Sequence, residues 1–257
     1  MRRPHAALQP FVREMVWVSS EDPRAQVLLP ETTFTLVLRQ SGTASLHGED
    51  LPHAVVSGLQ ERARVVHHGT KSSIIVVRFT EIGAPALLHD RADVVFAKTA
   101  PLNALIPGRT IESVQDQLAG ARTMDAQAAI VEKFLGERIQ PRNGVRAQIA
   151  AAAKLMREAG GRSPISAIAR RVAMSQSALE RHFRMATGAT PKMFSRLARL
   201  ERVCGLWDAG KDLTTIAFEA GYSDQPHLVR DFHLFTGMPP QQFFRAHSPR
   251  NLPIFYK

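Results

Sequence analysis

The sequence lacks the features that define several large classes of protein. It has a single cysteine, Cys204, so no internal disulfide can form, and this is consistent with a reducing compartment. No apolar run approaches the roughly 18 residues that a membrane-spanning helix needs. The first residues, MRRPHAALQPFVREMVW, are interrupted by polar side chains before an apolar signal region develops. We therefore expect a cytoplasmic protein that has no membrane segment.

Short motifs that mark common catalytic sites are also missing. The sequence contains no Gly-rich phosphate loop, no Gly-x-Ser-x-Gly elbow and no His-Glu-x-x-His motif. Five residues of the first half are candidate metal ligands on a β scaffold: His47, Glu49, His53, His67 and His68. Their spacing does not form a compact ligand set. We therefore expect no metal, no cofactor and no enzymatic activity.

Acidic residues are scarce in the second half of the chain. Residues 1–142 hold 16 Lys and Arg against 15 Asp and Glu, whereas residues 143–257 hold 17 against 8. Nearly all of the net charge of +10 therefore belongs to the second half. Such an excess suits contact with a phosphate backbone, but solvated basic helices or an acidic partner would give the same balance. Charge alone leaves these alternatives open.

An internal repeat in this basic half favours nucleic acid. Residues 168–194 read IARRVAMSQSALERHFRMATGATPKMF, and residues 216–243 read IAFEAGYSDQPHLVRDFHLFTGMPPQQF. In each copy an apolar helical stretch is followed by a turn and a second amphipathic helix, whose buried side includes Leu179 or its counterpart Leu228. The offset between the copies grows from 48 to 49 residues at the start of the second helix. The second copy therefore carries one extra residue there.

The second copy shows how each unit turns. Gly221 stands where a chain turning between two helices needs a positive φ, and Ala173 takes that place in the first copy. Ser223 is the expected N-cap of the following helix, and Asp224 and Pro226 are expected in its first turn. The pattern is typical of helix, turn and helix.

Between the copies, the pattern predicts one long helix. Residues 191–209 place Phe194, Leu197, Leu200, Val203, Cys204 and Trp207 on an apolar stripe. We therefore predict two helix-turn-helix units, at about 164–188 and about 213–237, joined by this connecting helix.

These motifs resemble the DNA-binding domain of the AraC/XylS family of transcription regulators. The resemblance covers about Asn143 to His247 and rests mainly on GYSDQPHLVRDFHLFTGMPPQQFFR, the two IA pairs, LERHF, and the endings TGATP and TGMPP. It implies a sequence-specific regulator that binds double-stranded DNA, with RNA polymerase as a candidate partner. Some proteins with this domain carry a cysteine-rich methyl acceptor for DNA repair, which a chain with one cysteine cannot build.

The first half has the pattern of short strands followed by helices. After a predicted helix over Leu8–Val18, the predicted strands are Val27–Leu29, Phe34–Leu38, Ala44–His47, Val55–Leu59, Arg64–His67 and Ile74–Phe79. The predicted helices are Ala84–Leu88, Leu102–Ile106, Ile111–Ala119 and Ala126–Arg138. Successive short strands favour an antiparallel sandwich or barrel. This half resembles, less specifically, the cupin-like sensor domains that precede such DNA-binding domains.

We therefore predict an α+β protein of two domains. Residues 1–142 would form a β-rich, cupin-like domain for sensing or dimerisation, and residues 143–257 an all-α domain that opens with a helix over Val145–Ala159. The boundary is placed at Pro141–Gly144, where an X-Pro bond meets an Asn-Gly pair. A small-molecule effector and a second copy of the chain are further candidate partners. The alternative is a cupin-like metalloenzyme that its basic half tethers to nucleic acid.

Each unit offers polar side chains to DNA from its second helix. The candidates are Ser175, Gln176, Ser177, Glu180, Arg181 and Arg184 in the first unit and Ser223, Asp224, Gln225, His227 and Arg230 in the second. Arg181 is the first candidate for a base contact, because Arg pairs bidentately with guanine, and Glu180 could accept from cytosine. The resemblance implies base reading by Ser177, Glu180, Arg181, Gln225, His227 and Arg230. Ion pairs on the helix surface are the alternative role for the two arginines.

Overall fold

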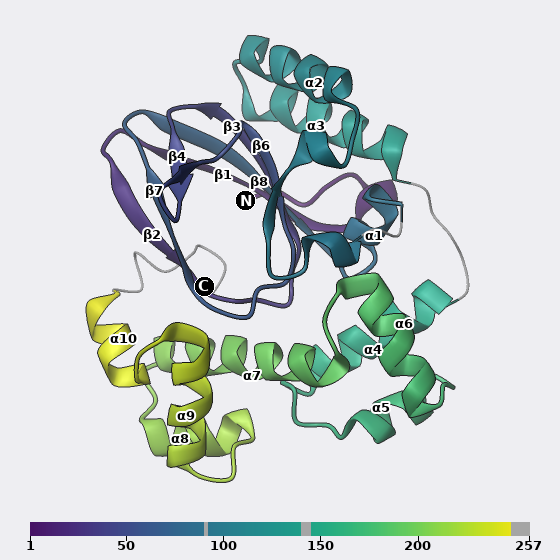
Figure 1. The fold of residues 1–257 in the computed structure, drawn as a ribbon, viewed down its shortest axis with the longest axis vertical. Helices are drawn as coiled ribbons and strands as arrows, with labels where there is room; N and C mark the ends of the chain where they lie inside the picture. Colours follow the sequence, from purple (N-terminus) through teal and green to yellow (C-terminus); the bar gives the residue numbers. More distant parts are fainter. Residues whose placement is uncertain (90–91, 140–144, 248–257) are drawn as a thin grey trace.

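The computed structural model describes residues 1–89, 92–139 and 145–247 (Figure 1). The first half is a sandwich of two antiparallel sheets, with strand orders β1-β8-β3-β6-β9 and β2-β7-β4-β5. The strands are β1 Val12–Ser20, β2 Arg24–Leu28, β3 Thr35–Ser41, β4 Ala44–Leu46, β5 Glu49–Asp50, β6 Ala54–Ser57, β7 Arg64–His68, β8 Ser72–Phe79 and β9 Thr99–Pro101. The predicted α+β fold, with a β-rich first half and a helical second half, is confirmed.

The two faces of the larger sheet have different roles. Because successive side chains of a strand point to opposite faces, neighbouring residues of β8 belong to different clusters. Ile75 and Val77 are fully buried in the main core, which continues into the helices. Ile74 and Val76 pack with Val37 of β3 in the space between the two sheets. The sheet therefore supports a helical layer on one face and lines a cavity on the other.

The prediction of a helix over Leu8–Val18 is wrong. A short 3-10 helix, η1, spans Ala6–Leu8, and the following residues form β1, which pairs with β8 over its whole length. The β-branched residues Val12, Val16 and Val18 suit a strand, and the neighbouring strand β8 supplies partners for the backbone of β1. The apolar spacing that predicted a helix is therefore a weaker determinant of this segment's structure than its pairing with the distant strand β8.

Helices cover the outer face of the larger sheet and form the second half of the chain. In the first half they are α1 Gly83–Leu87, the 3-10 helices η2 Ala92–Val95 and η3 Leu102–Ala104, α2 Gly108–Gly120 and α3 Met124–Arg138. In the second half they are α4 Val145–Glu158, α5 Ile165–Arg171, α6 Gln176–Thr187, α7 Pro191–Asp208, α8 Leu213–Ala220, α9 Gln225–Thr236 and α10 Pro240–Ala246. The proposed boundary at Pro141–Gly144 lies outside the described residues. No described helix is long and apolar enough to cross a bilayer.

The long helix α7 organises the second half. It runs beneath the sandwich, with α4, α5 and α6 at one end and α8, α9 and α10 at the other (Figure 1). The pairs α5–α6 and α8–α9 form the two helix-turn-helix units, so the predicted connecting helix is observed.

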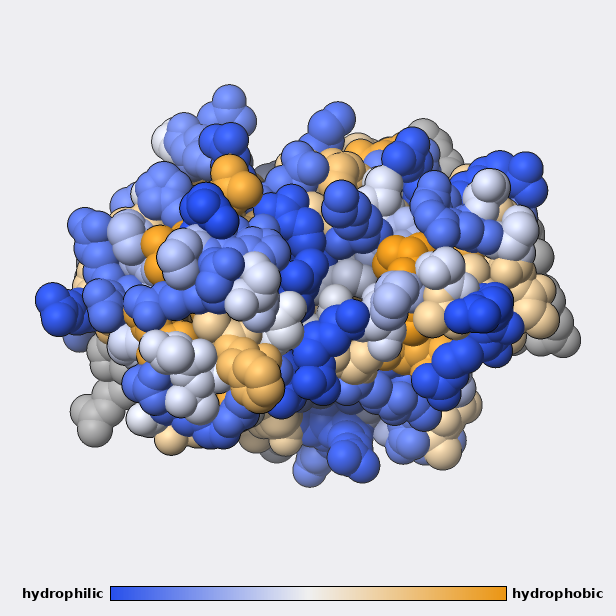
Figure 2. Space-filling model, turned by 90° about the horizontal axis from the view of Figure 1, so that it is seen from below, coloured by the Kyte–Doolittle hydropathy of each residue, from blue (hydrophilic) through white to orange (hydrophobic). Residues whose placement is uncertain are grey.

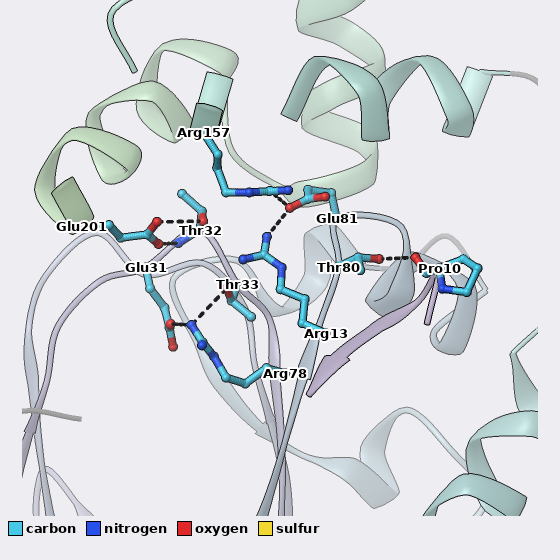
Figure 3. Close-up of polar contacts among 10 residues, drawn as sticks. All are labelled: Pro10, Arg13, Glu31, Thr32, Thr33, Arg78, Thr80, Glu81, Arg157 and Glu201. Carbon is cyan, nitrogen blue, oxygen red and sulfur yellow. Dashed lines mark hydrogen bonds and ion pairs between the residues drawn. The ribbon is translucent and has the colours of Figure 1, made fainter. Parts of the chain in front are cut away.

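A cluster of charged residues joins the two halves (Figure 3). Glu81, directly after β8, is ion-paired with Arg13 of β1 and with Arg157 of α4. The Glu81 side chain is 4% exposed and both arginine side chains are 24% exposed. Nearby, Glu201 of α7 accepts hydrogen bonds from the backbone N–H of Thr32 at 2.5 Å and from its hydroxyl at 3.2 Å. The sandwich is thus tied to both α4 and α7.

Further contacts reach each helix-turn-helix unit. The 3-10 helix η2 packs against α6, and Phe96 lies so close to Gly188 that a Cβ there would come within 2.3 Å of the phenyl side chain. On the other side, the Ala63 N–H donates to the carbonyl of Phe235 in α9 at 2.7 Å. The first half of the chain therefore contacts both units directly.

The turn residue differs between the two units in a way that can be tested. Gly221 has φ +82° and Ala173 has φ +54°, so both adopt the left-handed conformation. This conformation costs an L-residue roughly 1–2 kcal/mol, while glycine loses about 0.4–1 kcal/mol through the entropy of the unfolded chain. Ala173→Gly should therefore raise the free energy of unfolding by about 1 kcal/mol or less, measured by urea denaturation.

The matched change in the other unit should have the opposite sign. Gly221→Ala should lower the free energy of unfolding, because its Cβ would also meet the Arg162 side chain at 2.3 Å. Destabilisation by Ala173→Gly would show that the turn of the first unit is not strained.

The junction between the halves gives a second prediction. Glu81→Gln leaves Arg13 and Arg157 without a carboxylate, so the free energy of unfolding should fall by about 1–3 kcal/mol, less than for fully buried pairs because the arginines are partly exposed. Glu137→Gln is the control, since Glu137 is 64% exposed and its ion pair among the described residues is with Lys133 of its own helix at 4.0 Å. Equal stability of the two variants would contradict the role given to Glu81.

Candidate nucleic-acid interface

Helix α6 is the second helix of the first helix-turn-helix unit, and we call it the first recognition helix. A side-chain cap at its start and a buried apolar face stabilise it. Ser175 is its N-cap, and the serine hydroxyl accepts a hydrogen bond from the Ala178 N–H at 3.1 Å. Leu179 and Phe183 are fully buried, and the helix ends at Gly188, which has a positive φ of 73°. This arrangement turns the remaining face of α6 to solvent.

All six candidates of the first unit lie on that solvent face. Ser175, Gln176, Ser177, Glu180, Arg181 and Arg184 are exposed. The Gln176 amide donates to Glu180 at 3.0 Å, and the Arg181 guanidinium approaches only the His182 ring, at 3.4 Å. Arg181 has no acidic partner within the described parts of the chain, so its donors are free to meet a base or a phosphate.

The second recognition helix, α9, begins one residue later than predicted. Its N-cap is Asp224 and not Ser223: the Asp224 carboxylate accepts from the His227 N–H at 2.7 Å, and the Ser223 hydroxyl donates to the same carboxylate at 3.0 Å. The extra residue of the second copy lies at this turn, and the carboxylate is the stronger acceptor for the helix N–H groups. The bonds from His227 and Ser223 lower the pKa of Asp224.

The candidates of the second unit are less uniformly accessible. Ser223, Asp224, Gln225 and Arg230 are exposed, whereas His227 is partly buried. The His227 ring meets Tyr222 edge-on at 5.2 Å, and its Nδ1 lies 3.1 Å from the Ser223 hydroxyl. Arg230 forms no ion pair with any described residue. Arg230 is therefore the more available side chain for DNA, and His227 also contributes to packing.

A buried charged residue fixes α9 on α7. Asp231 is 7% exposed and accepts from Arg196 Nε at 2.9 Å and Nη2 at 2.7 Å and from the Tyr222 hydroxyl at 3.1 Å. Arg196 also lies over the Phe235 ring at 4.8 Å. Burial and the Asp231 carboxylate raise the pKa of Tyr222. These positioning residues were not among the candidates, although an aspartate three residues after the buried Leu228 was a signal for them.

The first unit is fixed on the same helix by aromatic packing. Phe183 of α6 meets Phe194 of α7 edge-on, with ring centroids 5.2 Å apart. With 18 residues, α7 is about 27 Å long. Figure 1 shows the two recognition helices towards opposite ends of α7, although their anchoring residues Phe194 and Arg196 both lie in its first third. The surface seen from their side is largely hydrophilic, with scattered apolar residues (Figure 2).

The candidate metal ligands of the first half do not form a site. Among the described residues, no three His, Cys, Asp or Glu side chains lie close enough to hold a metal ion. His53 and His67 are exposed, whereas His68 is buried and lines a cavity of about 110 Å³ between the two sheets. The residues that line this cavity were not predicted from the sequence.

Comparison with known proteins agrees with this geometry. A family model described as a helix-turn-helix domain matches residues 168–246. The bifunctional transcriptional activator/DNA repair enzyme Ada of Escherichia coli K12 is 34% identical over 92 residues, which cover 36% of this chain and 25% of Ada. The chain thus matches only a quarter of the length of that relative.

The whole fold resembles that of a solved protein. ToxT from Vibrio cholerae is 10% identical, with a TM-score of 0.50, over 91% of this chain and 98% of ToxT in one crystal structure. In a second ToxT structure the TM-score is also 0.50, over 94% of this chain and 99% of ToxT. The sandwich and the helical half together therefore form a known arrangement. The matched helix-turn-helix domain and the duplicated units on α7 agree with the resemblance found in the sequence: the second half of the chain carries two helix-turn-helix units joined by one helix.

Proposed function

We propose that the protein is a sequence-specific DNA-binding transcription regulator. The observation that carries this proposal is the pair of exposed recognition helices, α6 and α9, fixed near opposite ends of α7 in the basic half of the chain. Two such helices can enter successive major grooves, which lie about 34 Å apart on one face of the duplex. A single chain then reads an asymmetric site.

The exposed side chains divide into two groups by position. Arg181 and Arg230 project from the first half of their helices and lack acidic partners among the described residues, so we assign them to base edges. Ser175 and Ser223 lie at helix starts, where N–H groups and hydroxyls suit phosphates. Arg170 and Arg171, exposed at the end of α5, were not singled out from the sequence and add candidate phosphate contacts.

Removing the base-reading arginines should weaken specific binding. Arg181→Ala and Arg230→Ala should each cost about 1–3 kcal/mol, which is roughly 5- to 150-fold in Kd. Binding would be measured by fluorescence anisotropy on duplexes selected by the full-length protein from a random library, at stated salt. Arg109→Ala is the matched control, because it removes the same charge from an exposed position on α2.

The three outcomes for each arginine are distinguishable. A loss confined to the selected duplexes supports base reading. An equal loss on unrelated duplexes would reassign the arginine to a phosphate contact, and no loss at all would remove it from the interface. Failure of the wild-type protein to prefer any duplex would overturn the proposed function itself.

We also propose that the cavity between the sheets holds a small-molecule effector. The loop after β2 connects this cavity to the DNA-binding half: Glu31 and Thr33 line the cavity, while Thr32 between them is bound by Glu201 of α7 (Figure 3). Glu31 is held by an ion pair with Arg78, which also binds Glu14. A ligand that displaces this loop would change the contact with the helix that carries both recognition helices.

This route predicts a linkage between ligand and DNA. A compound that raises the thermal unfolding midpoint of the full-length protein should also change its Kd for the selected duplex, because two ligands of one protein affect each other reciprocally. Glu201→Ala should reduce that change in Kd at least several-fold, whereas Glu158→Ala, an exposed charge on α4, should not. An undiminished effect in Glu201→Ala would show that the signal takes another route.

The same proposal includes further protein partners and a cellular location. RNA polymerase and a second copy of the chain are the protein partners expected of a regulator that acts at promoters, in the cytoplasm where the DNA lies. The competing function is a metalloenzyme that is tethered to nucleic acid. It is not favoured, because the candidate metal ligands among the described residues do not lie together. Metal analysis of the purified protein separates the two, since stoichiometric zinc, iron or manganese would support the enzyme.

A further inference from the structure

We infer that the cavity between the two sheets binds an organic anion with an apolar body, whose charged end is held by Arg39 of β3 and His68 of β7. The inference rests on the proposed function in one respect: it assigns a chemical class to the effector of the same cavity. Its grounds are the burial, the partners and the charge of the lining residues.

Most of the cavity wall is apolar. Side chains from both sheets line it, among them Leu28, Val37, Val66 and Val76. Its volume of about 110 Å³ far exceeds the roughly 10–15 Å³ that a single water molecule needs. An apolar surface of this kind favours a hydrocarbon or aromatic body over a sugar or a nucleotide.

Three side chains that line this space have a buried nitrogen atom without a partner among the described residues: Arg39 Nε, Arg64 Nε and His68 Nδ1. Arg39 and His68 are the two that are buried as whole residues. Arg39 and His68 are each 7% exposed and lie on opposite sheets. The Arg39 guanidinium donates one hydrogen bond to the Leu51 carbonyl, but within the described residues its Nε has no partner, and neither has His68 Nδ1. Leaving buried donors unpaired costs about 1–3 kcal/mol each. A carboxylate between the two side chains would accept from the Arg39 guanidinium, and from the His68 ring in the form that carries a proton on Nδ1.

The positive charge around this end of the cavity is only partly compensated, because Asp50 of β5 acts on Arg39 but forms no ion pair with it among the described residues. Glu31 is the acidic residue among the cavity-lining side chains, and Arg78 already pairs with it. Burial, together with the positive charges of Arg24, Arg39 and His67, lowers the pKa of His68. These groups lie on β2, on β3 and beside His68 on β7. A bound anion would add a negative charge between Arg39 and His68.

The geometry also gives the direction of the ligand. Arg64 lines the cavity four residues before His68 on β7, which is about 13 Å along the strand, and its guanidinium donates to Thr99. The Glu31 loop, which contacts α7 through Thr32, lines the cavity too. With its anionic group at Arg39 and His68, a ligand with an extended body would run along β7 towards the Glu31 loop and Arg64, whose buried Nε offers a further donor to a polar group of the ligand.

The test compares three probes of equal chain length and different charge. Octanoate, 1-octanol and octylamine are titrated into the full-length wild-type protein at neutral pH, below their critical micelle concentrations, and binding is measured by calorimetry and by the thermal unfolding midpoint. We expect octanoate to bind at least tenfold more tightly than octanol, and octylamine most weakly. Octanol binding as tightly as octanoate, or octylamine more tightly, would overturn the inference.

Substitutions of Arg39 and His68 test whether these residues hold the anionic group of the ligand. Arg39→Met should weaken octanoate binding at least tenfold and leave octanol binding within about twofold, and the free variant should be as stable as the wild type because a buried cation without a carboxylate is removed. His68→Leu should act in the same direction. Arg109→Met on α2 is the control and should change neither affinity. Unchanged octanoate binding in both cavity variants would overturn the inference.

Measuring DNA binding distinguishes a failure of this inference about the ligand from a failure of the proposed regulatory function. Ligand-free Arg39→Met should bind the selected duplex as the wild type does. If the wild-type protein binds DNA specifically but shows no preference for the carboxylate, only the ligand class is wrong. If it prefers the carboxylate but no duplex, the ligand class holds and the proposed regulatory function is wrong.

Discussion

Both recognition helices are fixed by their packing on one helix, α7, and the rest of the structure depends on that constraint. Near the start of α7, Phe194 packs against Phe183 of α6, and two residues further along Arg196 holds Asp231 of α9 through two hydrogen bonds. An aromatic contact and a buried ion pair thus perform the same task in the two units. Because α7 is rigid, the spacing of the recognition helices is set before DNA is met, and no ordering cost falls on that spacing when the duplex binds.

The same helix is also the contact point for the sandwich. Glu201, five residues after Arg196 on α7, accepts both hydrogen bonds of Thr32, whose two neighbours in the chain line the cavity. Glu81 adds a second tie through Arg157 of α4. A movement of a few tenths of an ångström in that loop would therefore act on the element that carries both recognition helices, because close-packed interiors transmit strain. The sandwich can provide both the cavity and the contact because the side chains of each strand alternate between two faces.

Predictions from the sequence succeeded where structure is local and failed where it depends on distant partners. The repeat, the connecting helix and the polar faces of α6 and α9 follow from periodicity that a helix imposes within its own turns. The first strand was mistaken for a helix because its apolar spacing fits both, and only pairing with β8, about 60 residues away, decides between them. The N-cap of α9 was placed one residue early because Ser223 and Asp224 are both good caps, and the fold of the turn selects the carboxylate.

The sequence by itself determined that the second half is basic, duplicated and helical, and it named the exposed residues of both recognition helices. Charge, composition and periodicity are properties of the chain, and helices follow from contacts within a few residues. Only the tertiary structure decided that Asp231 anchors α9, that Glu201 joins the halves, and that Arg39 and His68 face one cavity from opposite sheets. These side chains are 29 to 169 positions apart from their partners, and no local pattern records which distant residues a fold brings together.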